Sequence, residues 1–296
     1  MIDFIRLYYR DKSRLECFVL DKENFETVST VMDYHTGEVK YPYRTKLESM
    51  DIGVSERSGY VKNSLHKLHN FRESAEDQNY NDFSFSKLCT EIDYLSKNII
   101  DAERTQLTQL EFGLNIEIAN LPELLVRRNF IMHKFKGGTG NTYQGKGELK
   151  QFTHENYFIK VYDKGKQFEL NKNVLRFELK FIKAKEFQKL GVHHIGDLKD
   201  KRNLRGLFNY LINRFNEMTI VDDFDENSIT DVKDYNNLQK YTNPLYWTEE
   251  IRGLHPQQRI RHKQSFEKIL LKNDLLKTKD NLRALLFKKY IHLINH

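Results

Sequence analysis

Hydrophobic and polar residues alternate in several segments of this chain, as in half-buried β-strands. The alternation runs through residues 2–9, IDFIRLYY, and through residues 109–120, QLEFGLNIEIAN. It returns at residues 157–162 and 175–181. Because successive side chains of a strand point to opposite faces of its sheet, each segment has one apolar face and one polar face.

Strand-like segments dominate the first 65 residues. The runs at residues 27–34 and 39–43 flank the letters HTGE, which is typical of a turn between two strands. Residues 15–20, LECFVL, are predicted to form a further strand. A series of antiparallel strands is therefore expected in this part of the chain.

Other segments repeat their apolar residues every three or four positions, which predicts helices. Residues 84–101 show this spacing behind a candidate N-cap, Ser84, and residues 203–218 show it again. Pro122 is suited to the first turn of a helix, so a helix is predicted over residues 122–135. Two more helical patterns lie near the end of the chain, at residues 256–274 and 279–295.

Together these elements predict an α+β fold with a central antiparallel sheet, flanking helices and a helical C-terminal region. Residues 222–234 hold six acids against one lysine, which indicates a boundary. We expect one domain over residues 1–222 and a basic helical region over residues 235–296 that binds DNA. Residues 136–147, KGGTGNTYQGKG, hold five glycines and are expected to form a mobile flap.

The net charge of +6 is unevenly distributed along the 296 residues. Residues 252–296 hold eleven Lys and Arg against three acids, which favours a polyanion as partner. Arg259, Arg261 and Lys263 are the candidate DNA contacts. The alternative is that this segment is a solubilising helix face.

Cysteine usage and hydropathy indicate a soluble protein of a reducing compartment. Cys17 and Cys89 are far apart and belong to no CxxC or Cys/His cluster, so neither a disulfide framework nor a zinc site is expected. The N-terminus has no secretory leader pattern, and no segment approaches the roughly 20 apolar residues of a membrane span. A cytoplasmic location follows as an expectation.

Polar side chains would gather on one surface if residues 157–162 and 175–181 paired in a sheet. The alternation places Lys160, Tyr162, Arg176, Glu178 and Lys180 on that surface. Lys160, Arg176 and Lys180 are candidate DNA contacts there. The alternative is the solvated charged side of an ordinary hairpin.

This constellation suits cleavage of a phosphodiester by a tyrosine. The reaction needs a phenol as nucleophile, a divalent metal ion to polarise the phosphate and lysines to neutralise developing charge. Tyr162 is the candidate nucleophile, with Lys164 and Lys166 beside it in the chain. The oxygen donors Glu111, Asn115 and Glu178 are the candidate ligands of Mg²⁺ or Mn²⁺, because these ions prefer carboxylates, carbonyls and water.

Four segments carry a family resemblance: MIDFIRLYY, LEFGLNIEI, KVYDKGKQ with LRFELKF, and HHIGDLKDKRNLRGL. With them, the chain resembles the phage and plasmid replication initiation proteins of the gene II/X family, from Met1 to the NPLYW motif at residues 243–247. It is more distantly similar to the rolling-circle initiators of small staphylococcal-type plasmids. Those proteins also have a strand with an acidic residue, a Tyr-x-Lys strand and an Arg-Phe-Glu strand.

The resemblance implies a rolling-circle replication initiator, a site-specific endonuclease and strand transferase. Such a protein binds an origin as single-stranded or hairpin DNA, nicks one strand through a tyrosine and stays attached to the 5′ phosphate; a host helicase would be a further partner. Glu111 takes the place of the family's metal-binding acid, and Glu178 is the glutamate of Arg-Phe-Glu. Tyr162 and Lys164 match the Tyr-x-Lys pair.

The chain departs from related nickases in two respects. It has no His-hydrophobic-His motif, so metal binding would depend on carboxylates. Phe187 stands about where relatives have a tyrosine after the Arg-Phe-Glu strand. The nucleophile is then Tyr162, Tyr143 or Tyr157, or the protein is a DNA-binding scaffold that has lost cleavage. A nuclease that uses metal-activated water is the third alternative.

Overall fold

The computed structural model describes residues 1–143 and 146–296, and it leaves out the side chains of residues 141–143. Most strands belong to one sheet: β1 (Ile2–Tyr9), β2 (Ser29–Met32), β3 (Val39–Leu47), β4 (Met50–Val54), β5 (Gly59–Ser64), β6 (Gln106–Glu117), β9 (Thr139–Tyr143), β10 (Lys146–Thr153), β11 (Tyr157–Asp163) and β12 (Val174–Phe181). Over the described residues, these strands form a ten-stranded antiparallel sheet in the order β2-β3-β4-β5-β1-β6-β12-β11-β10-β9. A smaller sheet has the order β13-β7-β8, from β13 (Met218–Ile220), β7 (Phe130–His133) and β8 (Lys136–Gly137).

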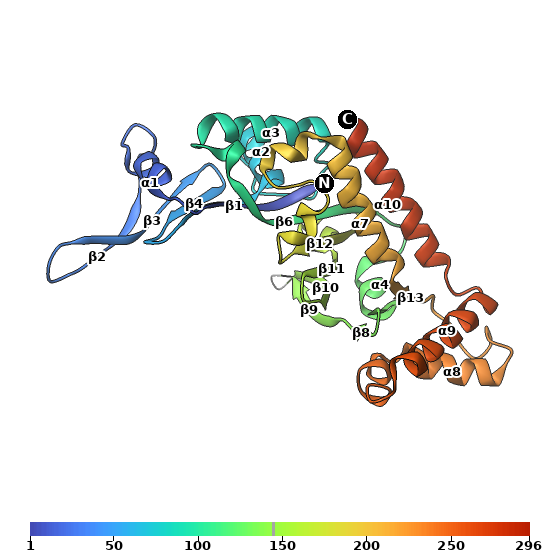
Figure 1. Ribbon diagram of the computed structural model, residues 1–296. Helices are drawn as coiled ribbons and strands as arrows, with labels where there is room; N and C mark the ends of the chain where they lie inside the picture. The colour runs from blue at the N-terminus through green and yellow to red at the C-terminus, as the bar shows by residue number, and fades with distance from the viewer. Residues whose placement is uncertain (144–145) are drawn as a thin grey trace. The chain divides into compact units, whose positions relative to one another are not determined.

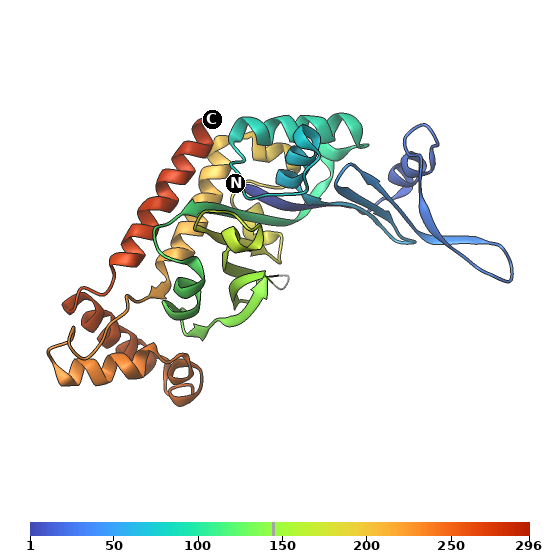
Figure 2. The ribbon, with the colours of Figure 1, turned by 180° about the vertical axis from the view of Figure 1, so that it is seen from behind.

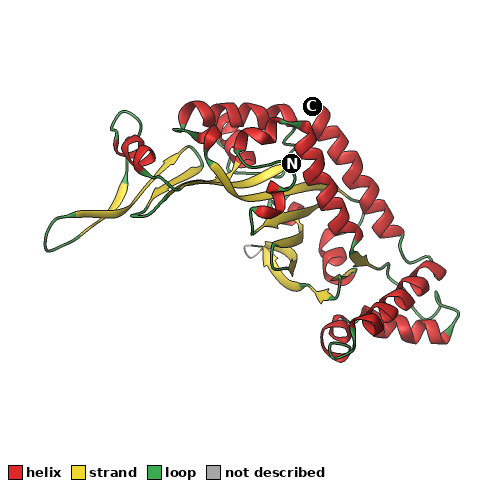
Figure 3. Cartoon of the chain, viewed as in Figure 1, coloured by secondary structure: helices red, strands yellow, loops and turns green. Residues whose placement is uncertain are grey.

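Helices make up most of the remaining structure (Figure 3). They are α1 (Ser13–Leu20), α2 (Leu65–Ser74), α3 (Phe85–Asn98), α4 (Pro122–Arg128), α5 (Lys164–Gln167), α6 (Lys185–Gln188), α7 (Lys201–Asn216), α8 (Val232–Thr242), α9 (Pro256–Lys272) and α10 (Lys277–Asn295). Short helical turns lie at Ala102–Arg104, Ile195–Lys199 and Tyr246–Glu250. The predicted α+β class is confirmed. No helix of the described residues is long and apolar enough to cross a membrane.

The chain divides into two compact units. The first comprises Met1–Gly113, Leu179–Asn209 and Tyr290–His296, and the second comprises Leu114–Glu178 and Tyr210–Lys289. Strands β6 and β12 are each continuous from one unit into the other. The division predicted from composition, at residues 222–234, stays a prediction.

In the first unit, α2 and α3 pack beside each other and α2 packs on β1 (Figures 1 and 2). The predicted apolar stripe of α3 is buried through Leu88, Ile92 and Leu95, and Ser84 occupies the N-cap position. The opposite side of that core consists of alternate residues of the strands, such as Leu7 and Val61. One face of β1 and β5 is therefore fixed against helices by the hydrophobic effect.

In the second unit, α8 and α9 enclose an aromatic core around Trp247. The indole is fully buried, stacks on Phe266 at 5.8 Å between ring centroids and donates a 2.6 Å hydrogen bond to the carbonyl of Tyr241. Apolar side chains of β7, including Met132, join the same core. The two helices predicted near the C-terminus, now α9 and α10, are confirmed.

Three local predictions are wrong. Residues 15–20 belong to helix α1, where Leu15 and Val19 are buried four positions apart. The helix that begins at Pro122 ends at Arg128, and Phe130–His133 form β7. The glycine-rich segment contains β8, β9 and the start of β10 rather than a loop, and its residues 144–145 lie outside the described residues.

Candidate active site

Three buried carboxylates lie on adjacent strands of the large sheet. Asp3 comes from β1, Glu111 from β6 and Glu178 from β12, and these strands are neighbours in the order given above. Each residue is at most 8% exposed. One carboxylate oxygen from each lies within 4.8 Å of those of the other two. We call these three residues the carboxylate group.

A β-bulge brings Asp3 to this group. Ile2 pairs with Phe112 and Ile5 pairs with Leu110, so the register between β1 and β6 shifts within residues 2–5. Strict alternation would place Asp3 on the apolar face with Ile5, and sequence reasoning therefore missed it. Bulges redirect side chains in this manner and are frequent beside active sites.

Hydrogen bonds hold the Asp3 carboxylate in place. Asn79 donates a 2.7 Å hydrogen bond to Oδ2, and the Ser64 hydroxyl donates to Oδ1. Ser64 is also the N-cap of α2, where its side chain accepts from the backbone N–H of Lys67. Both donors are neutral side chains, so these two contacts fix the carboxylate by hydrogen bonding.

Cations pair with the other two carboxylates. Lys180 Nζ lies 2.9 Å from Glu111. Glu178 accepts from Lys160 Nζ at 2.9 Å and from Arg176 Nε at 2.6 Å. Carboxylates this deeply buried require such partners, because taking an ion out of water is costly without compensation. Of the residues predicted to share a surface, Lys160 and Arg176 contact Glu178, whereas Lys180 contacts Glu111.

The donor set suits a hard divalent cation. All three members of the carboxylate group offer oxygen, the ligand that Mg²⁺ and Mn²⁺ prefer. The three negative charges face the three cations Lys160, Arg176 and Lys180, so a divalent ion would leave the site net positive and suited to a phosphate. Asn115, also predicted as a ligand, accepts a 2.9 Å hydrogen bond from Arg176.

Tyr162 and Lys164 lie next to Glu178 and are both buried. The Tyr162 hydroxyl donates to Glu178 Oε2 at 3.4 Å, and the side chain is 1% exposed. Lys164 opens α5, is fully buried and has its ammonium 5.5 Å from the centre of the Tyr162 ring. Lys166, the third predicted catalytic residue, lies at the surface and pairs with Glu123 at 2.6 Å.

The other candidate nucleophiles are elsewhere. Tyr157 stacks on His154 with 4.9 Å between ring centroids, in a cluster that also contains Tyr210. Phe187 is buried against Phe181. The side chain of Tyr143 lies outside the described residues.

The predicted C-terminal DNA contacts lie on α9, in the second unit. The Arg259 guanidinium lies 4.7 Å from the centre of the Phe135 ring. Lys263 pairs with Glu267 at 3.5 Å, and Arg261 is exposed. Their contact with DNA stays a prediction.

The cluster around Tyr157 contains two histidines, of which His133 is buried and His154 is partly exposed. His133 Nδ1 lies 2.7 Å from His154 Nε2, and His133 Nε2 lies 3.2 Å from Glu217. Burial lowers the pKa of His133 to about 3 and that of His154 to about 4. Because these values lie below the ordinary 6.5, both imidazoles stay neutral in the folded protein at pH values where the unfolded chain binds protons.

This difference predicts a loss of stability in mild acid. Above about pH 6.5 the two histidines do not lower the free energy of unfolding, because both states leave them neutral. Near pH 5 the unfolded chain binds a proton at His133 and the folded protein does not, which lowers the free energy of unfolding by about 2 kcal/mol. We expect urea unfolding of His133→Gln to depend less on pH, by about that amount, than unfolding of the native protein. His35→Gln, at an exposed histidine, is the matched control. Equal pH dependence in all three proteins would contradict the neutral histidine pair.

Comparisons with known proteins give a similarity in structure but none in sequence. No protein-family model matches the chain, and no curated protein sequence matches it. Among solved structures, the chain is similar to a rolling circle replication initiator protein from Geobacillus stearothermophilus, with a TM-score of 0.37 and 10% sequence identity. The match covers 68% of this chain and 78% of the other.

Proposed function

We propose that this protein is a metal-dependent DNA-nicking enzyme that initiates rolling-circle replication. The observation that carries the proposal is the carboxylate group with its surrounding cations, next to the hydroxyl of Tyr162. Buried acids within reach of one another are costly to keep, which favours a function for them over a purely structural explanation. DNA is the proposed substrate because the site combines oxygen ligands with cations that suit a phosphodiester.

Asp3, Glu111 and Glu178 would hold Mg²⁺ or Mn²⁺. When bound, such an ion supplies polarisation of the phosphate and stabilisation of its developing charge. Lys160 and Arg176, which pair with Glu178, would contact the non-bridging phosphate oxygens. Lys164 adds positive charge next to the phenol.

In the proposed reaction, Tyr162 Oη attacks phosphorus and the bond from phosphorus to the 3′ oxygen breaks. The phenolic proton passes to Glu178, whose Oε2 is its hydrogen-bond acceptor. The leaving 3′ oxygen takes a proton from water, and a 5′ phosphotyrosine remains. Closure of the strand is the reverse transfer: the 3′ hydroxyl attacks the phosphotyrosine and the phenol leaves. The phosphotyrosine keeps the energy of the phosphodiester, so closure needs no other cofactor.

The burial of Tyr162 favours a second candidate function. A phenol that is 1% exposed must move, or have its surroundings move, before it can reach a phosphate. A nuclease that attacks with water held by the carboxylate group would need no such movement. The two candidates share their metal ligands and differ in whether Tyr162 forms a covalent bond.

Metal binding is tested first with Glu111→Gln. We expect isothermal titration with Mn²⁺ to show at least about tenfold weaker binding, because the substitution removes one anionic ligand. Glu117→Gln is the matched control on the same strand, since the Glu117 side chain is 64% exposed and pairs with Lys172. Equal Mn²⁺ affinity of both variants and the native protein would rule out the carboxylate group as the metal site.

The nucleophile is tested with Tyr162→Phe on supercoiled plasmid and origin-like single strands in Mn²⁺. We expect loss of the covalent protein–DNA adduct and a decrease of at least about 10³-fold in nicking, because phenylalanine has no oxygen to attack phosphorus. Tyr157→Phe is the matched control. Unchanged cleavage without any adduct would favour the water-using nuclease, and DNA binding without cleavage would favour the silent scaffold.

A further inference from the structure

A row of side chains crosses four strands of the first unit on one face of the sheet. Arg44 on β3 pairs with Gly53 on β4, Gly53 with Tyr60 on β5, and Tyr60 with Tyr8 on β1. Directly paired residues of neighbouring antiparallel strands point to the same face. The row therefore places a cation, a glycine and two tyrosines side by side.

A second row runs beside the first on the same face. Lys46 pairs with Asp51, Asp51 with Lys62, and Lys62 with Arg6. Each of these residues is two positions from its counterpart in the first row, which keeps it on that face. Arg6 then pairs with Gln109 of β6.

This face continues to the carboxylate group. Glu111 follows Gln109 by two positions on β6, so it shares the face that carries Arg6. Lys180, which pairs with Glu111, also lies 5.2 Å from the centre of the Phe4 ring on β1. Phe4 precedes Arg6 by two positions, which gives an unbroken surface from β3 to Glu111.

Except for the buried Gly53, the residues of the two rows are exposed or partly exposed, whereas the other face is covered. Ile52, Val61 and Leu7 alternate with the rows and are at most 1% exposed. By contrast, Arg44 and Lys46 are exposed, and Tyr60 is partly exposed. The side chains of Arg44, Lys46 and Tyr60 are therefore accessible to a ligand on this face.

The ring of Tyr60 lies flat over Gly53. A Cβ atom on Gly53 would come within 2.4 Å of Tyr60 Cζ, so only glycine leaves room for the ring. The guanidinium of Arg6 is 5.3 Å from the ring centre, and the ammonium of Lys62 is 4.9 Å from it. An aromatic ring with adjoining cations is the usual platform for an unpaired nucleic-acid base and its phosphates.

Three cations of this face have no carboxylate partner. Within residues 1–143 and 146–296, neither Arg6, Arg44 nor Lys62 forms an ion pair, and Arg6 Nε is buried without a hydrogen-bond partner. Lys46 lies 3.8 Å from Asp51. The face therefore carries four positive charges, of Arg6, Arg44, Lys46 and Lys62, against the one negative charge of Asp51.

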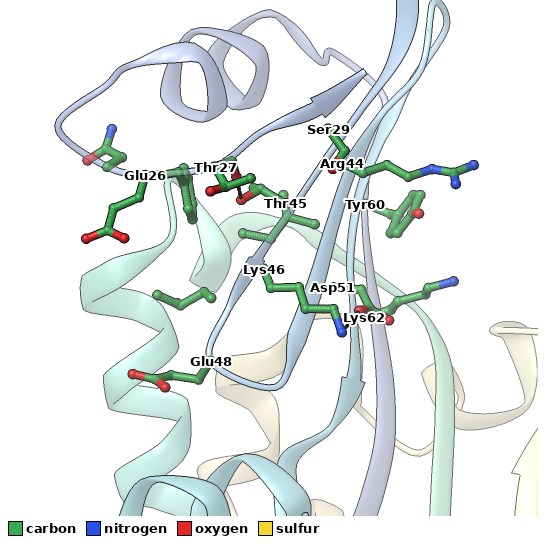
Figure 4. A pocket seen from close by; sticks show the side chains of 14 residues that line it. Glu26, Thr27, Ser29, Arg44, Thr45, Lys46, Glu48, Asp51, Tyr60 and Lys62 are labelled. Atoms are coloured by element: carbon green, nitrogen blue, oxygen red, sulfur yellow. Dashed lines mark hydrogen bonds and ion pairs between the residues drawn. The ribbon is translucent and has the colours of Figure 1, made fainter. Parts of the chain in front are cut away.

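A hollow of about 890 Å³ adjoins these strands. Figure 4 shows Arg44, Tyr60 and Lys62 pointing to one side of the strands, and Glu26 and Glu48 pointing to the other. Arg44 and Lys62 thus lie on the opposite side of the strands from Glu26 and Glu48, although Asp51 lies beside Lys46 and Lys62. A polyanion is attracted to the first side and repelled from the second.

We infer that this surface, the basic sheet face (Arg6, Arg44, Lys46, Tyr60 and Lys62), binds single-stranded DNA. Bases stack on Tyr60, phosphates contact Arg44, Lys62 and Arg6, and the strand runs toward Glu111. The inference rests on the proposed function, for which it supplies the track that leads the substrate to the carboxylate group. Single strands are preferred because paired bases cannot reach the flat ring of Tyr60.

The first experiment measures fluorescence anisotropy of a labelled oligonucleotide of about 20 thymidines, in EDTA. Arg44→Ala with Lys62→Ala should weaken binding at least about tenfold and reduce the salt slope by about 1.4, the value for two lost phosphate contacts. Lys22→Ala with Lys97→Ala removes the same charge from exposed positions off this face and should change neither quantity. Equal losses in both double variants would overturn the inference in favour of net charge alone.

The second experiment separates stacking from charge. Tyr60→Leu should weaken binding about tenfold, whereas Tyr60→Phe keeps the ring and should bind like the native protein. Tyr60→Phe also shows that the face folds when the hydroxyl is removed. Full affinity in Tyr60→Leu, or loss of binding only in a variant that neutralises Arg259, Arg261 and Lys263, would overturn the inference.

These measurements are independent of catalysis. Binding in EDTA needs no metal ion, so a failed Mn²⁺ titration or an absent adduct would refute the proposed function while leaving the basic sheet face supported. Conversely, normal nicking with unchanged oligonucleotide binding in Arg44→Ala/Lys62→Ala would refute the basic sheet face and leave the proposed function intact.

Discussion

The burial of Glu178 is the constraint on which the site depends. A carboxylate that is 2% exposed is stable only if hydrogen bonds and opposite charge replace its water, and Lys160, Arg176 and Tyr162 supply both. These partners come from β11 and β12, so the pairing of the two strands and the burial of this acid depend on the same contacts. Replacing the acid alone would remove the carboxylate that both Lys160 and Arg176 contact, which is more costly than losing the hydrogen bonds themselves.

The burial of Glu178 also determines the surroundings of Tyr162 and Lys164. Glu178 restrains the Tyr162 hydroxyl, and the ammonium of Lys164 lies near the phenol ring. A cation that displaced Lys160 and Arg176 from Glu178 would free two donors at the moment when a phosphate needs them. In the proposed function, the cations that pair with Glu178 would therefore also serve as substrate contacts. Lys166, paired with Glu123 at the surface, takes no part in this exchange.

Alternation in the sequence was sufficient to predict β6, β11 and β12, and with them the positions of Glu111 and Glu178. It failed where local geometry breaks the period of two. Asp3 reaches the carboxylate group through a bulge, and no single-sequence pattern marks a bulge between Ile2 and Ile5. The segment LECFVL is a short apolar run, and such a run suits a strand or a helix. The four-residue spacing from Leu15 to Val19 was the only sign of a helix in this segment, and it is too short to decide between the two. The glycine-rich segment was predicted from its local flexibility alone. Its β9 instead pairs with β10, so contacts between strands determine its structure.

Charge pairing divides the cations of the sheet into two kinds. Next to the carboxylates, Lys180 and Arg176 are neutralised by acids within the sheet and can act on a ligand only after those pairs open. On the basic sheet face, Arg6, Arg44 and Lys62 form no ion pair with any described residue, whereas Lys46 lies 3.8 Å from Asp51. If DNA binds as inferred, a ligand that contacts these three cations would gain binding free energy before the ion pairs at the carboxylates open. A strand held first by the face would be positioned for that exchange, because Arg6 and Glu111 lie on one side of adjacent strands.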